Sequence, residues 1–150
     1  MGVTGDQARL EIEGLGLGVN DRVCFVGNGT LPISVIKYAQ LGMTSVTGVD
    51  TDSEAINIAR RIVNNNSIKN VSFNHADGSD LDFTQYDVVV LAAMVDGKEE
   101  IVEKIRQQTD VPILVRVPKN TRAEILYSPC RKDPNRVIQY ANNVLQGNIY

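Results

Sequence analysis

Short apolar runs alternate with segments of helical periodicity from residue 22 onward, and this alternation limits the possible folds more than any other feature of the chain. The apolar runs predict five strands, at residues 22–26, 45–50, 71–75, 86–92 and 112–117. Runs this apolar are typical of strands that are buried on both faces of a parallel sheet. With helices between them, they predict an α/β fold with a doubly wound, mostly parallel sheet of Rossmann-like type.

Helices are expected between these strands. The helix-period segments lie at residues 30–42, 50–67 and 96–110, with a shorter one at 122–127. The second segment is the clearest, because its apolar side chains recur on one helical face, at Ala55, Ile58, Ala59, Ile62 and Val63. Asp52 or Ser53 can cap its first turn by accepting backbone N–H groups.

A chain of 150 residues is expected to form a single core. We expect the Rossmann-like domain to span residues 22–150. A lead-in over residues 1–21 precedes it and has some helical character, although its GLGLG run weakens a helix.

Charge and cysteine content exclude several partners. A net charge of -3 provides no basic field for nucleic acid or anionic lipid, and no apolar run approaches the roughly 20 residues of a membrane span. We therefore expect no nucleic-acid partner and no membrane partner. Cys24 and Cys130 lack metal-ligand spacing and His75 is the single histidine, so we expect no metal site. Cysteine used as a small buried side chain indicates a reducing, cytoplasmic location.

A glycine turn follows the first expected strand, in the sequence VCFVGNGTLP at residues 23–32. Glycine accepts a positive φ and lets a ligand approach the backbone closely. Doubly wound sheets bind ligands at the carboxyl ends of their strands. We therefore predict that Gly27, Asn28 and Gly29 belong to a ligand site.

Acidic residues follow the next two strands. Asp50 ends the second strand, where a carboxylate can accept hydrogen bonds from both hydroxyls of a ribose, and we place Asp50 and its neighbour Thr51 in the site. Asp77 follows the third strand, where it can accept a hydrogen bond from an adenine amine, and Gly78 leaves room beside the ring. Suitable groups at the ends of three successive strands predict a nucleoside site.

The residue at the end of the turn separates the possible cofactors. A dinucleotide fingerprint has a third glycine where this sequence has Pro32, and that glycine allows close helix packing beside a pyrophosphate. No Gly-Lys-Ser/Thr follows the turn, which excludes a phosphate-binding loop. S-adenosylmethionine has no phosphate and needs only a glycine turn, a ribose acid and an adenine contact. We therefore predict S-adenosylmethionine as the ligand and a class I methyltransferase-like form of the fold.

Three stretches of the chain together resemble the nicotianamine synthase family: residues 23–63, the segment YDVVVLAAMVDGKEEIVEKI and the segment ILVRVPKNTRAEILYSP. The resemblance covers residues 22–129. It implies a transferase that moves an aminobutyrate (aminocarboxypropyl) group from S-adenosylmethionine to an amine acceptor and releases methylthioadenosine. The acceptor would be a small amine or amino acid.

The resemblance also implies roles for individual residues. Gly27 and Gly29 would flank the methionine part of the ligand, Asp50 would hold the ribose and Asp77 the adenine. The floor of the site after the fourth strand would consist of Ala92, Ala93 and Met94.

Three further residues are implied on the substrate side. Arg116 and Arg122 would hold a substrate carboxylate by two-pronged contacts, and Tyr127 would place a hydroxyl in the cleft. Members of the family carry a helical domain before the nucleotide-binding domain, and their catalytic acid and tyrosine come largely from it. The lead-in is too short to form such a domain, so the sequence does not identify the catalytic residues or the general base. The sequence leaves open a homodimer or association with a separate helical domain.

Other functions of the same fold stay open. One is an ordinary small-molecule methyltransferase, although Phe25 stands where many such enzymes have an acid. Another is a regulatory module that binds S-adenosylmethionine without turnover, as the missing helical domain would allow. A nicotinamide-dependent oxidoreductase is disfavoured by Pro32 and by the lack of a Tyr-x-x-x-Lys pair.

Overall fold

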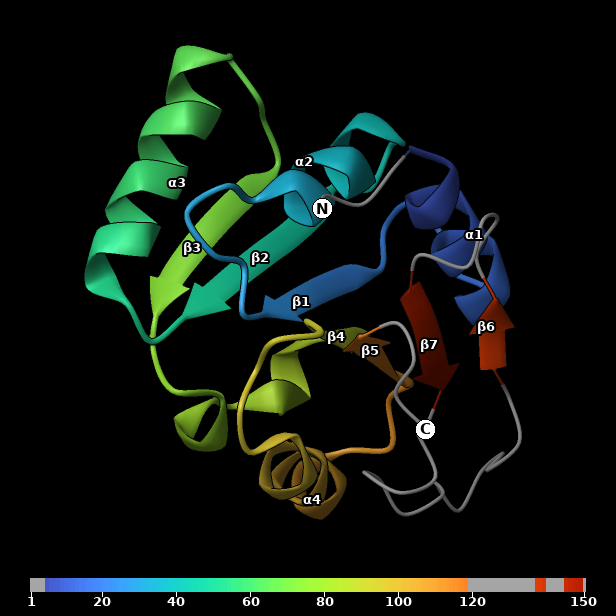
Figure 1. Ribbon diagram of the computed structural model, residues 1–150. Helices are drawn as coiled ribbons and strands as arrows, with labels where there is room; N and C mark the ends of the chain where they lie inside the picture. The colour runs from blue at the N-terminus through green and yellow to red at the C-terminus, as the bar shows by residue number, and fades with distance from the viewer. Residues whose placement is uncertain (1–4, 119–136, 140–144, 150) are drawn as a thin grey trace.

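One sheet of seven strands, in the order β3-β2-β1-β4-β5-β7-β6, organises the molecule (Figure 1). This computed structural model describes residues 5–118, 137–139 and 145–149, and the strands are counted among those residues. The parallel strands are β1 (Arg22–Val26), β2 (Ser45–Asp50), β3 (Val71–His75), β4 (Val88–Leu91) and β5 (Ile113–Pro118). β7 (Leu145–Ile149) pairs with β5 and with β6 (Val137–Gln139), and it is antiparallel to both.

The five predicted strands are present, with small shifts at their ends. β4 is shorter than expected because residues 83–85 form a single helical turn and Asp87 accepts the backbone N–H of Arg22 at 2.7 Å. β6 and β7 were not predicted: β6 has only three residues, and β7, with the sequence LQGNI, has polar residues and a glycine between its two apolar ends. The helix expected at residues 122–127 lies outside the described residues.

Four helices accompany the sheet in the described part of the chain: α1 (Gly5–Leu15), α2 (Ile33–Gln40), α3 (Ser53–Asn65) and α4 (Lys98–Gln108). α1 lies within the lead-in. It ends at Leu15, directly before the GLG sequence at residues 16–18, whose glycines disfavour a helix. Asp52 caps α3 as expected, because its Oδ1 accepts the amide of Glu54 at 2.9 Å.

The sheet has a hydrophobic core on each face. Alternate residues of β1 face opposite cores: Phe25 packs with α1, α2 and α3, whereas Cys24 packs with α4. Figure 1 shows α1 and α2 on one side of the sheet and α4 on the other. β4 is buried along its whole length, as expected of a central parallel strand.

The direction in which the chain winds reverses between β1 and β4. From β1 the chain proceeds outward to β2 and β3, then returns to the other side of β1 at β4 and continues to β5. Such a reversal leaves a crevice at the carboxyl ends of the two central strands, where ligands of this architecture bind. Within the described residues, no helix is both long and apolar enough to cross a membrane.

Candidate functional site

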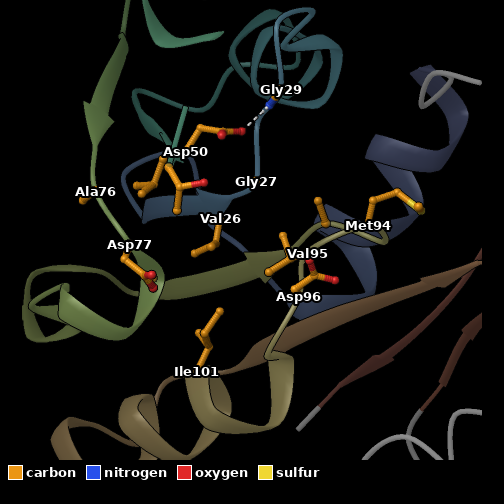
Figure 2. Close-up of a pocket in the computed structure, with 14 residues that line it drawn as sticks. Val26, Gly27, Gly29, Asp50, Ala76, Asp77, Met94, Val95, Asp96 and Ile101 are labelled. Atoms are coloured by element: carbon orange, nitrogen blue, oxygen red, sulfur yellow. Dashed lines mark hydrogen bonds between the residues drawn. The ribbon is translucent and has the colours of Figure 1, made fainter. Parts of the chain in front are cut away.

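A cavity of about 390 Å³ opens at this reversal point. Its volume falls in the range of roughly 300–1,000 Å³ that is usual for small-molecule sites. Figure 2 shows the side chains around it, which come from the carboxyl ends of β1 to β4 and from α4. The lining consists of Val26, Gly27, Gly29, Val49, Asp50, Thr51, Ala76, Asp77, Gly78, Ala92, Met94, Val95, Asp96 and Ile101.

The turn after β1 forms one edge of the cavity and requires glycine at two positions. Gly27 has φ +86° and Gly29 has φ +66°, both in the left-handed region. A Cβ on Gly27 would also lie 2.3 Å from Cγ2 of Val95, so no side chain fits there. The amide of Gly27 donates to the carbonyl of Val49 at 2.7 Å, which ties the turn to β2.

Asp50 joins the glycine turn to the start of α3. Its Oδ2 accepts the backbone N–H of Gly29 at 2.9 Å and its Oδ1 accepts that of Asp52 at 3.0 Å (Figure 2 shows the first contact). Each carboxylate oxygen can accept more than one hydrogen bond, so both retain capacity for ribose hydroxyls. Thr51 lies beside Asp50 in the lining, and its carbonyl is 2.8 Å from Nε2 of His75.

Asp77 occupies the corresponding position after β3. Its Oδ1 accepts hydrogen bonds from the amide and the hydroxyl of Ser79, each at 2.9 Å, and these bonds hold the pKa of the carboxyl below its usual value. Beside it, Gly78 is buried against the cavity wall. A Cβ there would lie 3.0 Å from Cγ1 of Val26 and 3.1 Å from Cδ1 of Ile101. The absence of a side chain therefore keeps this wall flat.

The loop between β4 and α4 forms the opposite wall. Ala92, Met94, Val95 and Asp96 line the cavity, and Met94 is 83% exposed. Ala93, also predicted for the floor, is not part of the lining; its carbonyl instead accepts a hydrogen bond from Lys98. Asn28 is likewise outside the lining, and its Nδ2 donates to the carbonyl of Gly29 at 2.6 Å. All the other residues predicted for the cofactor surround this one cavity.

The lining carries an excess of negative charge. Asp50, Asp77 and Asp96 contribute three carboxylates, and none of the fourteen lining residues described is a lysine, an arginine or a histidine. This charge favours a ligand with a positive centre and hydroxyl or amine donors, and it disfavours a pyrophosphate. Sequence reasoning missed Asp96, which lies further from its strand than Asp50 and Asp77 do, in the loop between β4 and α4.

The structure gives Arg116 a partner that was not anticipated. Its Nη2 and Nε lie 2.6 and 2.9 Å from the two carboxylate oxygens of Glu11 on α1, and its Nη1 donates to Oγ of Ser34 at 2.6 Å. Arg116 is 4% exposed and is not in the cavity lining. The two-pronged carboxylate contact expected of Arg116 is therefore present, but the carboxylate belongs to the protein itself. Arg122 and Tyr127 lie outside the described residues.

Glu11 is the centre of a buried polar cluster, which consists of Glu11, Ser34, Tyr38 and Arg116. Its side chain is inaccessible to solvent, and Oε1 accepts a hydrogen bond from the hydroxyl of Tyr38 at 3.1 Å. Phe25 supports the cluster: its ring meets that of Tyr38 edge to face at 4.7 Å, and the guanidinium of Arg116 lies 5.4 Å from its centroid. The sequence signal for this cluster is a glutamate that lies among apolar residues in the lead-in.

No group of three or more histidine, cysteine, aspartate or glutamate side chains could hold a metal ion within the described residues. The cavity itself has the features of an organic-ligand site: a glycine turn, a ribose-type carboxylate and apolar walls from Val26, Val95 and Ile101.

Comparison with known proteins identifies related sequences. A family profile described as "Nicotianamine synthase protein" matches residues 6–141. L-histidine 2-aminobutanoyltransferases from two strains of Pseudomonas aeruginosa are 28% identical over 115 residues, which is 74% of this chain and 44% of theirs. The chain thus spans less than half the length of the curated relatives it matches.

Solved structures show the same fold. A glutamate-to-glutamine variant of MtNAS in complex with S-adenosylmethionine superposes with a TM-score of 0.75 at 19% identity, covering 94% of this chain and 58% of that one. An RNA methyltransferase from Salinibacter ruber in complex with S-adenosyl-L-homocysteine superposes with a TM-score of 0.75 at 15% identity, covering 99% and 93%. The class I methyltransferase-like fold expected from the sequence is therefore confirmed.

Proposed function

The chain belongs to the nicotianamine synthase family, and on this premise we propose that its cavity binds S-adenosylmethionine and that the protein transfers the aminobutyrate group of that ligand to a small amine or amino-acid acceptor. Methylthioadenosine would be the second product. The activity of the whole protein is part of this proposal, because the relatives named for aminobutanoyl transfer are longer than this chain.

The charge of the cavity is the observation that carries the proposal. S-adenosylmethionine has a positive sulfonium and no phosphate, and the lining offers three carboxylates without a described basic residue. Asp50 would accept hydrogen bonds from the ribose and Asp77 from the adenine amine. Val26 and Ile101 would pack against the adenine ring, whose thickness the flat wall at Gly78 accommodates.

The reaction consists of one substitution at carbon. The acceptor nitrogen attacks the γ-carbon next to the sulfonium, a C–N bond forms, and the C–S bond breaks with its electron pair remaining on sulfur. The sulfur thereby becomes the neutral thioether of methylthioadenosine, while the attacking amine gains positive charge and must release a proton. The protein has to orient the two reactants and accept that proton.

We place proton transfer on Glu11 and Tyr38. The family resemblance implies a catalytic acid and tyrosine, and these two residues form a hydrogen-bonded carboxylate and phenol. Glu11 lies in α1, within the lead-in, where the sequence alone indicated no general base. Glu11 and Tyr38 are both buried and lie outside the cavity lining, so we propose that the acceptor amine reaches them from the side of α1. Their cluster packs on Phe25, which directly precedes the cavity residue Val26 on β1.

Two large exposed apolar side chains, one in the cavity lining and one in the segment after the glycine turn, suggest how the cavity is completed. Leu31, just after the glycine turn, is 60% exposed, and Met94 in the opposite wall is 83% exposed. We propose that a helical domain or a second copy of the chain covers these side chains and excludes water during the reaction. We also propose a cytoplasmic location, because the thiol of Cys24 is buried and unpaired.

Product analysis tests the reaction. The purified chain is incubated with S-adenosylmethionine and a panel of amino acids, L-histidine included, and the nucleoside products are separated by chromatography and mass spectrometry. Methylthioadenosine together with an aminocarboxypropylated amine supports the proposal. Adenosylhomocysteine with a methylated product would instead establish a methyltransferase. Binding without either product would establish a non-catalytic binding module.

A further inference from the structure

Lys98 is buried beside the cavity although it carries an ammonium group. It is the first residue of α4 and is 6% exposed. Lysine is rarely buried unless its charge has partners, because desolvation of an ammonium is costly. Burial lowers the pKa of Lys98, and the nearby charge of Asp96 acts in the opposite direction.

The ammonium joins two segments that are distant in sequence. Its Nζ donates to the carbonyl of Ala93, in the loop after β4, and to the carbonyl of Arg116, on β5, at 3.2 Å. Both acceptors are backbone groups. Lys98 therefore fixes the position of the main chain itself. A hydrogen bond to a side chain would constrain the main chain less directly.

The first of these segments is a wall of the cavity. Two backbone hydrogen bonds also hold this loop: the amide of Ala92 donates to the carbonyl of Val26 on β1 at 3.0 Å, and the amide of Val95 donates to the carbonyl of Ala92 within the loop at 3.3 Å. Val95 also fills the space beside Gly27 that a side chain would need. A shift of this loop would consequently change both the wall and its contact with the glycine turn.

The second segment, on β5, contains Arg116, which donates hydrogen bonds to Glu11. The carbonyl of Arg116 accepts a hydrogen bond from Lys98 and its guanidinium donates to Glu11, so the ammonium contacts the backbone of a member of the buried polar cluster. The contacts of Lys98 thus connect the wall of the cavity to the backbone that holds this cluster in place.

We infer that Lys98 is a positioning residue, which sets the spacing between the Ala92–Asp96 wall and the Glu11–Arg116 pair through two backbone carbonyls. This inference rests on the proposed function, since it assigns ligand binding to the cavity. The residues involved are not those predicted to bind the ribose or the adenine. A methionine of similar length would fill the same space but could not donate to either carbonyl.

The test uses Lys98→Met, Lys98→Arg as the conservative rescue, and Lys104→Met, an exposed lysine of the same helix, as the control. Two quantities are measured: the Kd for methylthioadenosine by calorimetry, and hydrogen exchange of the Ala92 and Val95 amides in the ligand-free chain by NMR. We expect Lys98→Met to raise the Kd on the order of tenfold and to speed exchange at both amides. Lys98→Arg should restore most of both effects, and Lys104→Met should change neither.

The outcomes separate this inference from the proposed function. If the wild-type chain does not bind methylthioadenosine, the proposed function fails, whereas the exchange experiment still reports on the wall. If the wild type binds and Lys98→Met has the same Kd and the same exchange rates, the positioning role is wrong. A Lys98→Met chain that does not fold would also overturn it, because a positioning residue leaves the sheet intact.

Discussion

Asp50 accepts the backbone amide of Gly29 through Oδ2 at 2.9 Å, so the carboxylate predicted to hold a ribose also holds the glycine turn. The left-handed conformation of Gly29 points its amide toward β2, and the carboxylate at the end of that strand fixes it there. Ligand affinity and the shape of the turn therefore depend on the same side chain.

Replacing Asp50 by alanine should weaken the binding of methylthioadenosine by about 1–3 kcal/mol, because the ribose hydroxyls and the Gly29 amide both lose an acceptor. Calorimetric titration gives the affinity. The control is Asp80→Ala, which removes an exposed carboxylate outside the cavity. An unchanged binding isotherm for Asp50→Ala would show that the ribose lies elsewhere.

The Asp96→Asn variant should distinguish the charged ligand from its neutral product. Asp96 lines the cavity and is exposed, so its attraction for the sulfonium of S-adenosylmethionine is screened and is expected to contribute about 1 kcal/mol. Measured in low salt, the variant should bind S-adenosylmethionine more weakly than the wild type does. Its affinity for methylthioadenosine, which lacks the positive charge, should equal that of the wild type. Equal losses for both ligands would mean that Asp96 acts through the shape of the cavity.

Removing one partner of the Glu11–Arg116 pair should be costly. Arg116→Met leaves a buried carboxylate without its guanidinium and is expected to lower the free energy of unfolding by about 3–5 kcal/mol. The double variant Glu11→Leu with Arg116→Met should lose less than the sum of the two single changes, since no charge is then left unpaired. Urea unfolding followed by circular dichroism measures each value.

The exposed pair of Arg22 and Asp87 supplies the control for that experiment. Its side chains are 50% and 37% exposed, and the contact spans 3.1 Å. Arg22→Met should therefore lower the free energy of unfolding far less than Arg116→Met does. If Arg116→Met and Arg22→Met lowered the free energy of unfolding by similar amounts, burial would not account for the cost of losing Arg116.

Cys24 should make stability depend on alkaline pH. Burial raises the pKa of its thiol to about 12 from an ordinary value of 9.0. Between these values the unfolded chain loses the thiol proton and the folded chain keeps it, so the contribution of Cys24 to stability is fully present below pH 9.0 and declines as the pH rises toward 12. The decline is about 1.4 kcal/mol per pH unit within that window.

Urea unfolding of the wild type and of Cys24→Ala at pH 8 and pH 10.5 measures this contribution. The difference in stability between the two chains should shrink at the higher pH. Iodoacetamide at pH 8 should modify Cys24 only in urea, which peptide mapping can follow separately from Cys130. Rapid labelling of Cys24 in the folded chain would show that β1 is accessible.

The sequence predicted the central part of the fold because strong local signals and the global topology agree there. The continuous apolar run of β4 and the capping carboxylate of Asp52 each specify an element without reference to distant residues. β7 has no such signal, because its place in the sheet depends on pairing with β5, more than twenty-five residues earlier in the chain. The positions of Asp50 and Asp77 followed from the topology alone.

The buried cluster shows where sequence reasoning failed. Arg116 was expected to bind a carboxylate, and nothing local indicated that Glu11, 105 residues away in sequence, would supply it. The pairing arises only when α1 packs on the face of the sheet that carries Phe25. Asp96 does not end a strand as Asp50 does, and its place in the cavity lining depends on the path of the loop after β4.

The position of β7 has a consequence for how the protein is made. β7 follows β6 in sequence but lies between β5 and β6 in the sheet, so β6 has no strand to pair with until β7 has left the ribosome. Until then β5 remains an open edge, with unpaired N–H and C=O groups that can recruit another chain. A delay before β7 emerges would therefore leave this edge available for aggregation.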